Sequence, residues 1–223
     1  MAVNYRALLP LLLVAALAVR LQPLALPSFT DPDHYYHLRI SEAVVAQGTY
    51  PSFDALSYQG RPQTYYPLFH FLLAEAALLT GWDAYWAYAV FSLLVFAAGI
   101  LAVFSLSRAL AKSEAVAFYC ALSYAFLPAT FIRSLAFTRP DSMALFLLPV
   151  LALFLHRRHL PALAVLALFL PLLHVFTSLI AGFLAVLWAG NNFIRKNALN
   201  PLQDLDWKLL LSYGLPWLLG ASY

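Results

Sequence analysis

Charged residues are scarce in this sequence, and cysteine is almost absent. Of 223 residues only 10% are Asp, Glu, Lys or Arg, whereas 63% are hydrophobic. A soluble domain has about 25% charged and about 45–50% apolar residues. The composition therefore excludes a globular protein that is surrounded by water alone. The one cysteine, Cys120, lies in an apolar run and excludes an intrachain disulfide. Internal repeats and low-complexity tracts are also missing, and the apolar residues do not alternate with polar ones as in a membrane β-barrel.

The apolar residues gather in continuous runs, which predict membrane-spanning helices. The runs occupy residues 6–26, 67–80, 84–107, 114–131, 142–155, 160–173, 175–190 and 208–222. At about 20 residues for each span, the length has room for about six or seven spans. The first run follows Arg6 and has no clean small-x-small cleavage site after it, so we expect an uncleaved span whose Arg20 snorkels to the far interface. The fold prediction is an all-α, polytopic transmembrane bundle that forms one domain over 1–223.

The run at 67–80 decides the predicted topology, because it holds His70 and Glu75 and is short for a span. If this run does not span and the N-terminus is cytoplasmic, eight basic residues fall inside and five outside. If the run spans, only three fall inside and ten fall outside. The positive-inside rule favours the first arrangement. We therefore expect an interfacial helix at 67–80 within a large external loop, about 27–83, and a second external loop at about 132–141.

Acidic residues are enriched on the predicted external side, where seven of the ten lie. These seven are Asp31, Asp33, Glu42, Asp54, Glu75, Asp83 and Asp141. Acidic residues contribute little to membrane topology, so their enrichment needs another explanation. We expect a protein of the cell membrane whose active face lies outside the cytoplasm.

The first acidic segment has the signals of a helix start. Asp31 precedes a proline, which is typical of an N-cap followed by a first helical residue. Asp33 then lies in the first turn, where the helix dipole favours a carboxylate, and the helix is predicted to end at Gly48. Helix capping explains Asp31 fully, but it explains Asp33, His37 and Arg39 less well.

Two later segments have the same kind of chemistry. Arg139 and Asp141 flank a proline and follow Arg133, a pattern that also fits the ordinary start of a helix. His174 lies near Thr177 at the predicted tip between two spans, where a lone histidine is usually an interfacial residue. Each segment alone therefore favours a structural interpretation.

Taken together, the segments bring carboxylates, imidazoles and arginines to one side of the membrane. At least two of them begin helices, whose free N–H groups attract anions. Carboxylates suit a hard divalent cation such as Mg or Mn, and a cation beside arginines suits a phosphate or pyrophosphate leaving group. The aromatic and proline residues around Tyr66 would lie near an isoprenoid tail, although this pattern is also typical of an interfacial aromatic belt.

At these residues the sequence resembles the membrane glycosyltransferases of the GT-C class, above all the catalytic subunit of the single-subunit archaeal and bacterial oligosaccharyltransferases. The resemblance is carried by Asp33-His34-Tyr35-Tyr36-His37-Leu38-Arg39, Gly48-Thr49-Tyr50-Pro51, Phe53-Asp54, Tyr66-Pro67-Leu68 and Arg139-Pro140-Asp141. It implies that Asp33 and Asp141 are catalytic and coordinate a divalent cation, Mn or Mg, and that Asp33 orients an acceptor amide. The residues expected to bind substrate are His37, Arg39, Tyr66, Arg133, Arg139 and His174.

The sequence also departs from this family. The family's second motif usually carries two ligands, whereas Asp141 is followed by Ser142 and Met143. The sequence contains neither the family's later external loop with a further acidic residue nor its soluble domain with a Trp-Trp-Asp-Tyr-Gly motif. The segment Trp82-Asp83-Ala84-Tyr85-Trp86 only looks similar to that motif and lies in a different region of the chain. The chain ends inside an apolar run, as expected of an N-terminal fragment or of a short relative with a different acceptor.

The resemblance implies transfer of a glycan from a polyprenyl-phosphate or pyrophosphate donor to an acceptor, with protein asparagine preferred. The nearest alternative is a GT-C enzyme that moves one sugar from a polyprenyl-phosphate donor to a protein, a lipid or another glycan. A transporter would place ionisable groups in mid-membrane and show paired repeats, and a non-catalytic subunit would need no external cluster of acids. The expected partners are the lipid-linked donor, the acceptor and the membrane, and no nucleic acid.

Overall fold

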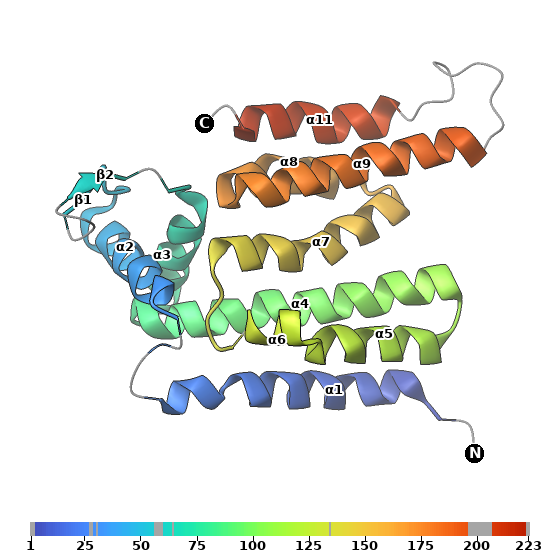
Figure 1. Cartoon of the computed structure of the whole chain (residues 1–223), viewed down its shortest axis with the longest axis horizontal. Helices are drawn as coiled ribbons and strands as arrows, with labels where there is room; N and C mark the ends of the chain where they lie inside the picture. The colour runs from blue at the N-terminus through green and yellow to red at the C-terminus, as the bar shows by residue number, and fades with distance from the viewer. Residues whose placement is uncertain are drawn as a thin grey trace.

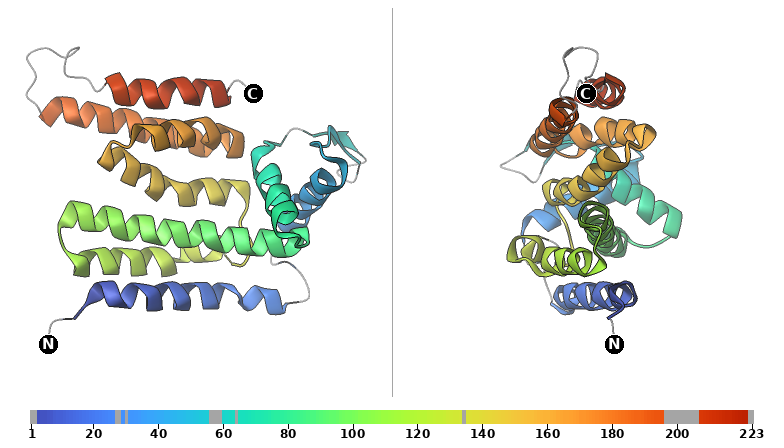
Figure 2. Two further views of the ribbon diagram at one scale, coloured as in Figure 1. Left: turned by 180° about the vertical axis from the view of Figure 1, so that it is seen from behind. Right: turned by 90° about the vertical axis from the view of Figure 1, so that its right-hand side faces the viewer.

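The computed structural model describes residues 3–26, 29, 31–55, 60–63, 65–133, 135–195 and 207–221. Most of the helices lie side by side in one bundle (Figures 1 and 2). These helices are α1 (Tyr5–Arg20), α4 (Ala84–Ala111), α5 (Glu114–Phe126), α7 (Pro140–Arg157), α8 (Leu160–Leu173), α9 (Val175–Arg195) and α11 (Trp207–Ala221). The predicted all-α fold is thereby confirmed.

Within the described residues, three helical segments are long and apolar enough to cross a membrane: Tyr5–Ala25, Ala84–Ala111 and Pro140–Arg157. Shorter apolar helices cover Leu68–Thr80, Glu114–Phe126, Leu160–Leu173 and Val175–Ala189. The apolar runs predicted about six or seven spans, because run length alone does not show where a helix ends. Pro128 has no N–H and ends the helix within the run at 114–131, where the short helix α6 (Pro128–Ile132) follows.

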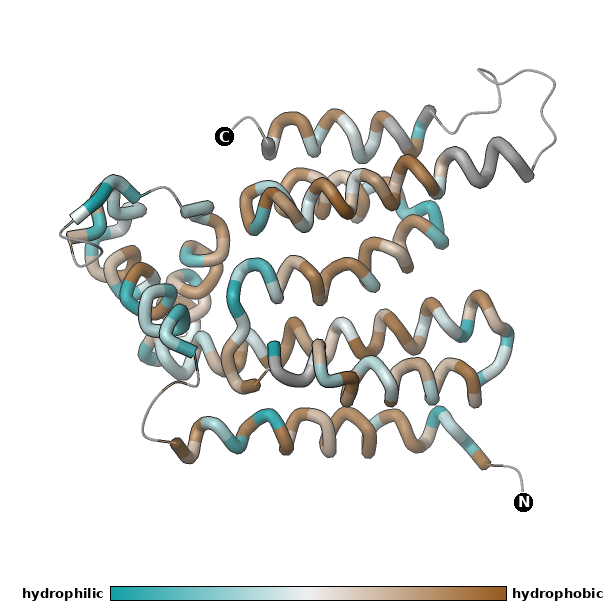
Figure 3. The backbone as a smooth tube through the Cα atoms, in the orientation of Figure 1, coloured by the Kyte–Doolittle hydropathy of each residue, from teal (hydrophilic) through white to brown (hydrophobic). Residues whose placement is uncertain are grey.

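The remaining elements gather at one end of the bundle, as Figure 1 shows. They are η1 (Gln22–Ala25), α2 (Asp33–Gln47), β1 (Phe53–Asp54), β2 (Arg61–Pro62) and α3 (Leu68–Thr80). Both α2 and α3 end at a glycine in the left-handed conformation, Gly48 with φ 69° and Gly81 with φ 70°. The two short strands pair antiparallel, with Asp54 opposite Arg61. Colouring by hydropathy shows hydrophilic residues at this end, where α2 and α7 begin, as well as at turns of the opposite end (Figure 3).

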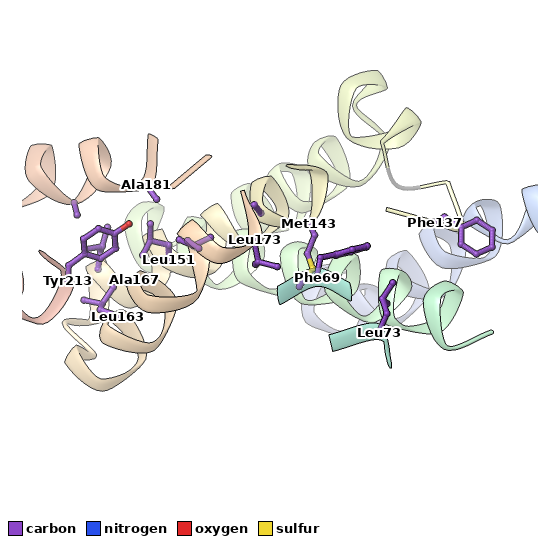
Figure 4. Packing of buried hydrophobic residues seen from close by; sticks show 14 of the residues in the cluster. Phe69, Leu73, Phe137, Met143, Leu151, Leu163, Ala167, Leu173, Ala181 and Tyr213 are labelled. Carbon is purple, nitrogen blue, oxygen red and sulfur yellow. The ribbon is translucent and has the colours of Figure 1, made fainter. Parts of the chain in front are cut away.

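The hydrophobic core continues from the bundle into this polar end. Phe69 and Leu73 of α3 are fully buried and belong to the same cluster as Met143 and Leu173 of the bundle. Figure 4 shows Met143 and Leu173 beside Phe69. This packing fixes α3, and α2 with it, against the beginning of α7 and the end of α8. A second cluster joins α1, α4 and α5 around Phe96.

The expectation that Arg20 reaches the membrane interface was wrong. Its side chain is fully buried, and its guanidinium carbon lies 3.6 Å from the centroid of the Phe96 ring. The guanidinium also donates hydrogen bonds to the carbonyls of Ala16 and Ala125. The chain leaves the helical conformation at Leu127, just before the proline that ends α5. The backbone carbonyls in the last turn of α5 therefore lack N–H donors from a following turn and need other hydrogen-bond donors. Arg20 supplies one of these donors and thereby joins α1 to α5.

Candidate functional site

Arg139 lies at the centre of a charged cluster at the point where α2 and α7 begin. Its guanidinium contacts Asp33 at 2.9 Å, Asp141 at 3.3 Å and Asp31 at 3.5 Å. Arg133 also binds Asp141, at 2.8 Å and through the same carboxylate oxygen that Arg139 contacts. The cluster therefore unites three carboxylates and two guanidinium groups from two segments that are about a hundred residues apart.

The local sequence explains why these side chains lie at helix starts. Arg139 is the N-cap of α7 in an extended conformation, and the proline after it occupies the first helical position. Asp141 follows in the first turn, where the helix dipole stabilises its charge. In α2 the helix begins at Asp33, one residue later than the sequence predicted, with Pro32 at the N-cap. The Asp31 carboxylate still accepts the N–H of Asp33 at 3.0 Å, so the predicted capping role is kept in altered form.

A buried layer of hydrogen bonds holds the two helix starts in register. The Tyr88 hydroxyl of α4 donates to the carbonyl of Thr138 at 2.8 Å and lies 3.1 Å from Nδ1 of His34. Because that hydroxyl has one proton, the network requires His34 to donate from Nδ1. The Thr138 N–H donates to the hydroxyl of Ser92 at 3.0 Å. His34, Tyr88 and Ser92 were not among the predicted site residues, because only the packing of α2 and α7 on α4 brings them into this network.

A cavity of about 330 Å³ opens beside the cluster. Its lining consists of Asp31, Pro32, His34, Arg133, Leu135, Arg139 and Ser142. Two guanidinium groups and the N-terminus of α7 face a region that also holds carboxylates. Arginines and helix N-termini bind phosphate oxygens, and carboxylates bind cations. The site thus has groups for an anion and for a cation side by side.

His174, which was predicted from its place between two spans, lies within electrostatic reach of this cluster. Its Nδ1 accepts from the hydroxyl of Thr177 at 2.9 Å and from the Thr177 N–H at 3.3 Å, which caps the start of α9. Burial lowers the pKa of His174, while the charge of Asp141 raises it and that of Arg139 lowers it further. The imidazole is therefore neutral at pH 7 and keeps Nε2 as its N–H donor.

Within the described residues, the other predicted substrate-binding residues form no bond to the cluster, although the charge of Arg139 adds to burial in lowering the pKa of His37. His37 is buried, and its Nδ1 lies 3.0 Å from Nε2 of His70. Arg39 forms an ion pair with Asp54 at 2.7 Å, and Tyr66 is partly exposed beside its neighbour in the loop. Over the described ranges, no hydrogen bond or ion pair connects His37, Arg39 or Tyr66 to the Arg139 cluster. Their role in substrate binding stays a prediction.

The cluster fits a metal ion by its donor chemistry more than by its present arrangement. Among the side chains described, no group of three or more His, Cys, Asp or Glu residues is placed to hold a metal. However, Asp33 and Asp141 contact two nitrogens of the same guanidinium, so carboxylates from α2 and α7 already converge on one positive charge. Hard carboxylate oxygens are the ligands that Mn and Mg prefer. Metal coordination by Asp33 and Asp141 stays a prediction.

The His37–His70 pair predicts that the polar end loosens in acid. Burial lowers the pKa of His37 to about 2 and that of His70 to about 4, from an ordinary value of 6.5. The unfolded chain therefore binds more protons below pH 6.5, and stability falls by about 1.4 kcal/mol per pH unit for each histidine that stays neutral. Hydrogen exchange of α2 and α3, corrected for the intrinsic exchange rate at each pH, should show protection that falls from pH 6.5 to pH 4. The variant His70→Gln should show a shallower pH dependence, and an equal slope in both proteins would contradict this.

The fold and the cluster define a class: helical, multi-pass membrane proteins with a charged site at one end of the bundle. Over 106 residues, 46% of this chain, the sequence is 34% identical to dolichyl-phosphooligosaccharide-protein glycotransferase 2 of Archaeoglobus fulgidus. The match spans 18% of that relative's length. No family model matches the chain, and no solved structure matches it. The similarity to a glycotransferase is thus distant and partial.

Proposed function

We propose that this protein transfers a glycan from a polyprenyl-phosphate or pyrophosphate donor to an acceptor, preferably the side chain of a protein asparagine. The observation that carries the proposal is the convergence of Asp33 and Asp141 on Arg139, beside a cavity lined by two arginines. The similarity to a glycotransferase whose name specifies a dolichyl-linked oligosaccharide and a protein supports this donor and acceptor.

The arrangement gives each group a role in this reaction. Arg133, Arg139 and the N-terminus of α7 would bind the oxygens of the lipid-linked phosphate and keep it beside the cavity. Asp33 and Asp141 would hold Mn or Mg, which when bound neutralises charge on the departing phosphate. Asp33, which is more than half exposed, would also orient the acceptor amide for attack on the anomeric carbon. We place this end of the bundle outside the cytoplasm, where the donor would enter sideways from the membrane.

A second candidate is transfer of a single sugar from a polyprenyl-monophosphate donor. One observation favours it: the residue after Asp141 is Ser142, whose hydroxyl lies 3.4 Å from the Asp141 carboxylate, instead of a second charged ligand. Departure of the sugar adds one negative charge to either leaving group, but the monophosphate carries a smaller total charge than the pyrophosphate and needs fewer ligands to neutralise it.

Transfer from labelled donors tests both candidates. The protein, expressed to its natural stop codon and reconstituted in liposomes, receives a polyprenyl-pyrophosphate oligosaccharide and an acceptor peptide with an Asn-x-Ser/Thr sequence, with Mn. We expect labelled peptide to form, to disappear with a chelator and to return with added Mn. Transfer from a polyprenyl-phosphate monosaccharide alone would select the second candidate. A folded protein that transfers from neither donor would refute the enzyme proposal and favour a non-catalytic subunit or a transporter.

A further inference from the structure

At the opposite end of the bundle α4 leads into α5 and α7 leads into α8 (Figure 1), and basic residues outnumber acidic ones at these described helix ends. Arg108 and Lys112 lie at the end of α4, and Arg157 lies at the end of α7. The one acidic residue beside them in the described structure is Glu114 at the start of α5, which forms ion pairs with Arg6 and, at 3.9 Å, with Arg108. Positive charge is therefore in excess at this end.

The excess charge surrounds a cavity of about 570 Å³. The cavity is lined by Ser105, Arg108, Ala109, Lys112, Glu114 and Arg157. At the other end of the bundle, Arg39, Arg133 and Arg139 each bind an aspartate. Here, over the residues that the structure describes, neither Lys112 nor Arg157 takes part in an ion pair. Aspartates thus neutralise these arginines at the end with the Arg139 cluster, whereas Lys112 and Arg157 at the opposite end have no described acidic partner.

Two ordinary effects explain only part of this pattern. Basic residues stabilise helix C-termini, and they mark the cytoplasmic side of membrane proteins. Both effects place single cations at helix ends, but neither requires cations from two helices to face one hollow. Apolar side chains such as Leu110 and Val116 are exposed close to the cavity in sequence, with 58% and 44% of their surfaces accessible. The surroundings therefore offer charge for a headgroup and an apolar surface for acyl chains.

We propose that this cavity binds the phosphate headgroup of an anionic phospholipid from the cytoplasmic leaflet, with its acyl chains along the exposed faces of α4 and α5. Arg108, Lys112 and Arg157 neutralise the headgroup, while Ser105 offers a hydroxyl to the phosphate oxygens. Basic pockets between helices on the cytoplasmic side bind anionic headgroups in this way. The inference does not depend on the proposed glycan transfer, because it concerns the other end of the molecule.

The test measures lipid binding to the full chain in neutral detergent by native mass spectrometry. The probes are phosphatidylglycerol, phosphatidylcholine and inorganic phosphate. The double variant Arg108→Gln/Arg157→Gln removes two cations from the cavity, and each removed cation should weaken phosphatidylglycerol binding about fivefold. Lys208→Gln, which removes an exposed cation from the N-terminal end of α11, is the matched control and should bind as the wild type does.

We expect phosphatidylglycerol to bind more tightly than phosphatidylcholine and to resist displacement by millimolar phosphate. The pair Arg108→Lys/Arg157→Lys keeps both charges and should retain binding. Equal affinity for the two lipids, wild-type affinity in the Gln pair or loss of binding in the Lys pair would each overturn the proposal. Displacement of the lipid by inorganic phosphate would overturn it in favour of a soluble phosphate compound.

Discussion

Replacing Asp33 by Asn is expected to lower kcat/KM for glycan transfer by at least about 100-fold and to leave the protein folded. Asn has nearly the same shape as Asp but removes the charge that contacts Arg139 at 2.9 Å. The Asp33 side chain is 58% exposed, and an ion pair so open to solvent contributes at most about 1 kcal/mol to stability. A large loss of activity would therefore report chemistry and not unfolding. Initial rates with the labelled donor and thermal unfolding of the same preparation measure both quantities.

Glu42→Gln provides the matched control for this variant. Glu42 is an exposed acid on the same helix as Asp33, so the substitution makes the same change of charge at a distance from the cluster and should leave kcat/KM unchanged. Asp141→Asn should reduce transfer about as much as Asp33→Asn, and the double variant should add little, because residues that act as a unit are not additive. If Asp33→Asn kept more than half of the activity, the cluster would be a structural junction between α2 and α7.

The position of Arg139 supports the catalytic proposal on physical grounds. A guanidinium that joined two helices for stability alone would need one carboxylate, whereas Arg139 contacts three. Three carboxylates near one arginine repel one another, and this repulsion costs stability unless a ligand relieves it. Arg133 relieves part of the repulsion at Asp141. We propose that an additional cation relieves the rest, as the predicted divalent metal ion would.

The sequence predicted the parts of the site that depend on local signals. Proline and aspartate at the helix starts placed Asp33 and Asp141 in the first turns of α2 and α7 within one residue, and Gly48 marked the end of α2. The approach of Arg139 to Asp33 is not a local property, because it depends on how α2 and the start of α7 both pack on α4. Only the predicted topology and the family resemblance pointed to it.

Hydropathy alone could not predict the buried polar contacts. His34 belongs to a segment that was explained as a capped helix, and Tyr88 belongs to an apolar run. Their hydrogen bond exists only because α2 packs on α4. Arg20 was misjudged for a similar reason. At the end of an apolar run an arginine normally turns to the interface, but here a broken helix offers it carbonyl acceptors inside the protein.

Removing the Arg20 side chain should destabilise the junction between α1 and α5 strongly. Arg20→Ala deletes the contact with the Phe96 ring at 3.6 Å, leaves an empty space and takes the hydrogen-bond donor from the carbonyl of Ala125. An unsatisfied buried carbonyl costs about 1–3 kcal/mol and truncation of a large buried side chain about 2–5 kcal/mol. Relief of the buried charge offsets part of this loss, so we expect a net destabilisation of about 3 kcal/mol.

Arg20→Met separates the charge from the volume. Methionine fills the space and removes the cost of burying a charge, so this variant should lose the polar contacts of the guanidinium but keep the packing, at a cost of about 1–3 kcal/mol. Leu11→Ala, on the exposed face of the same helix with 65% of the leucine accessible, is the control and should unfold like the wild type in lipid. Thermal unfolding in nanodiscs should thus rank the proteins as wild type, Leu11→Ala, Arg20→Met and Arg20→Ala. An Arg20→Ala protein as stable as Leu11→Ala would show that α1 is held by its apolar contacts alone, through the residues that pack around Phe96.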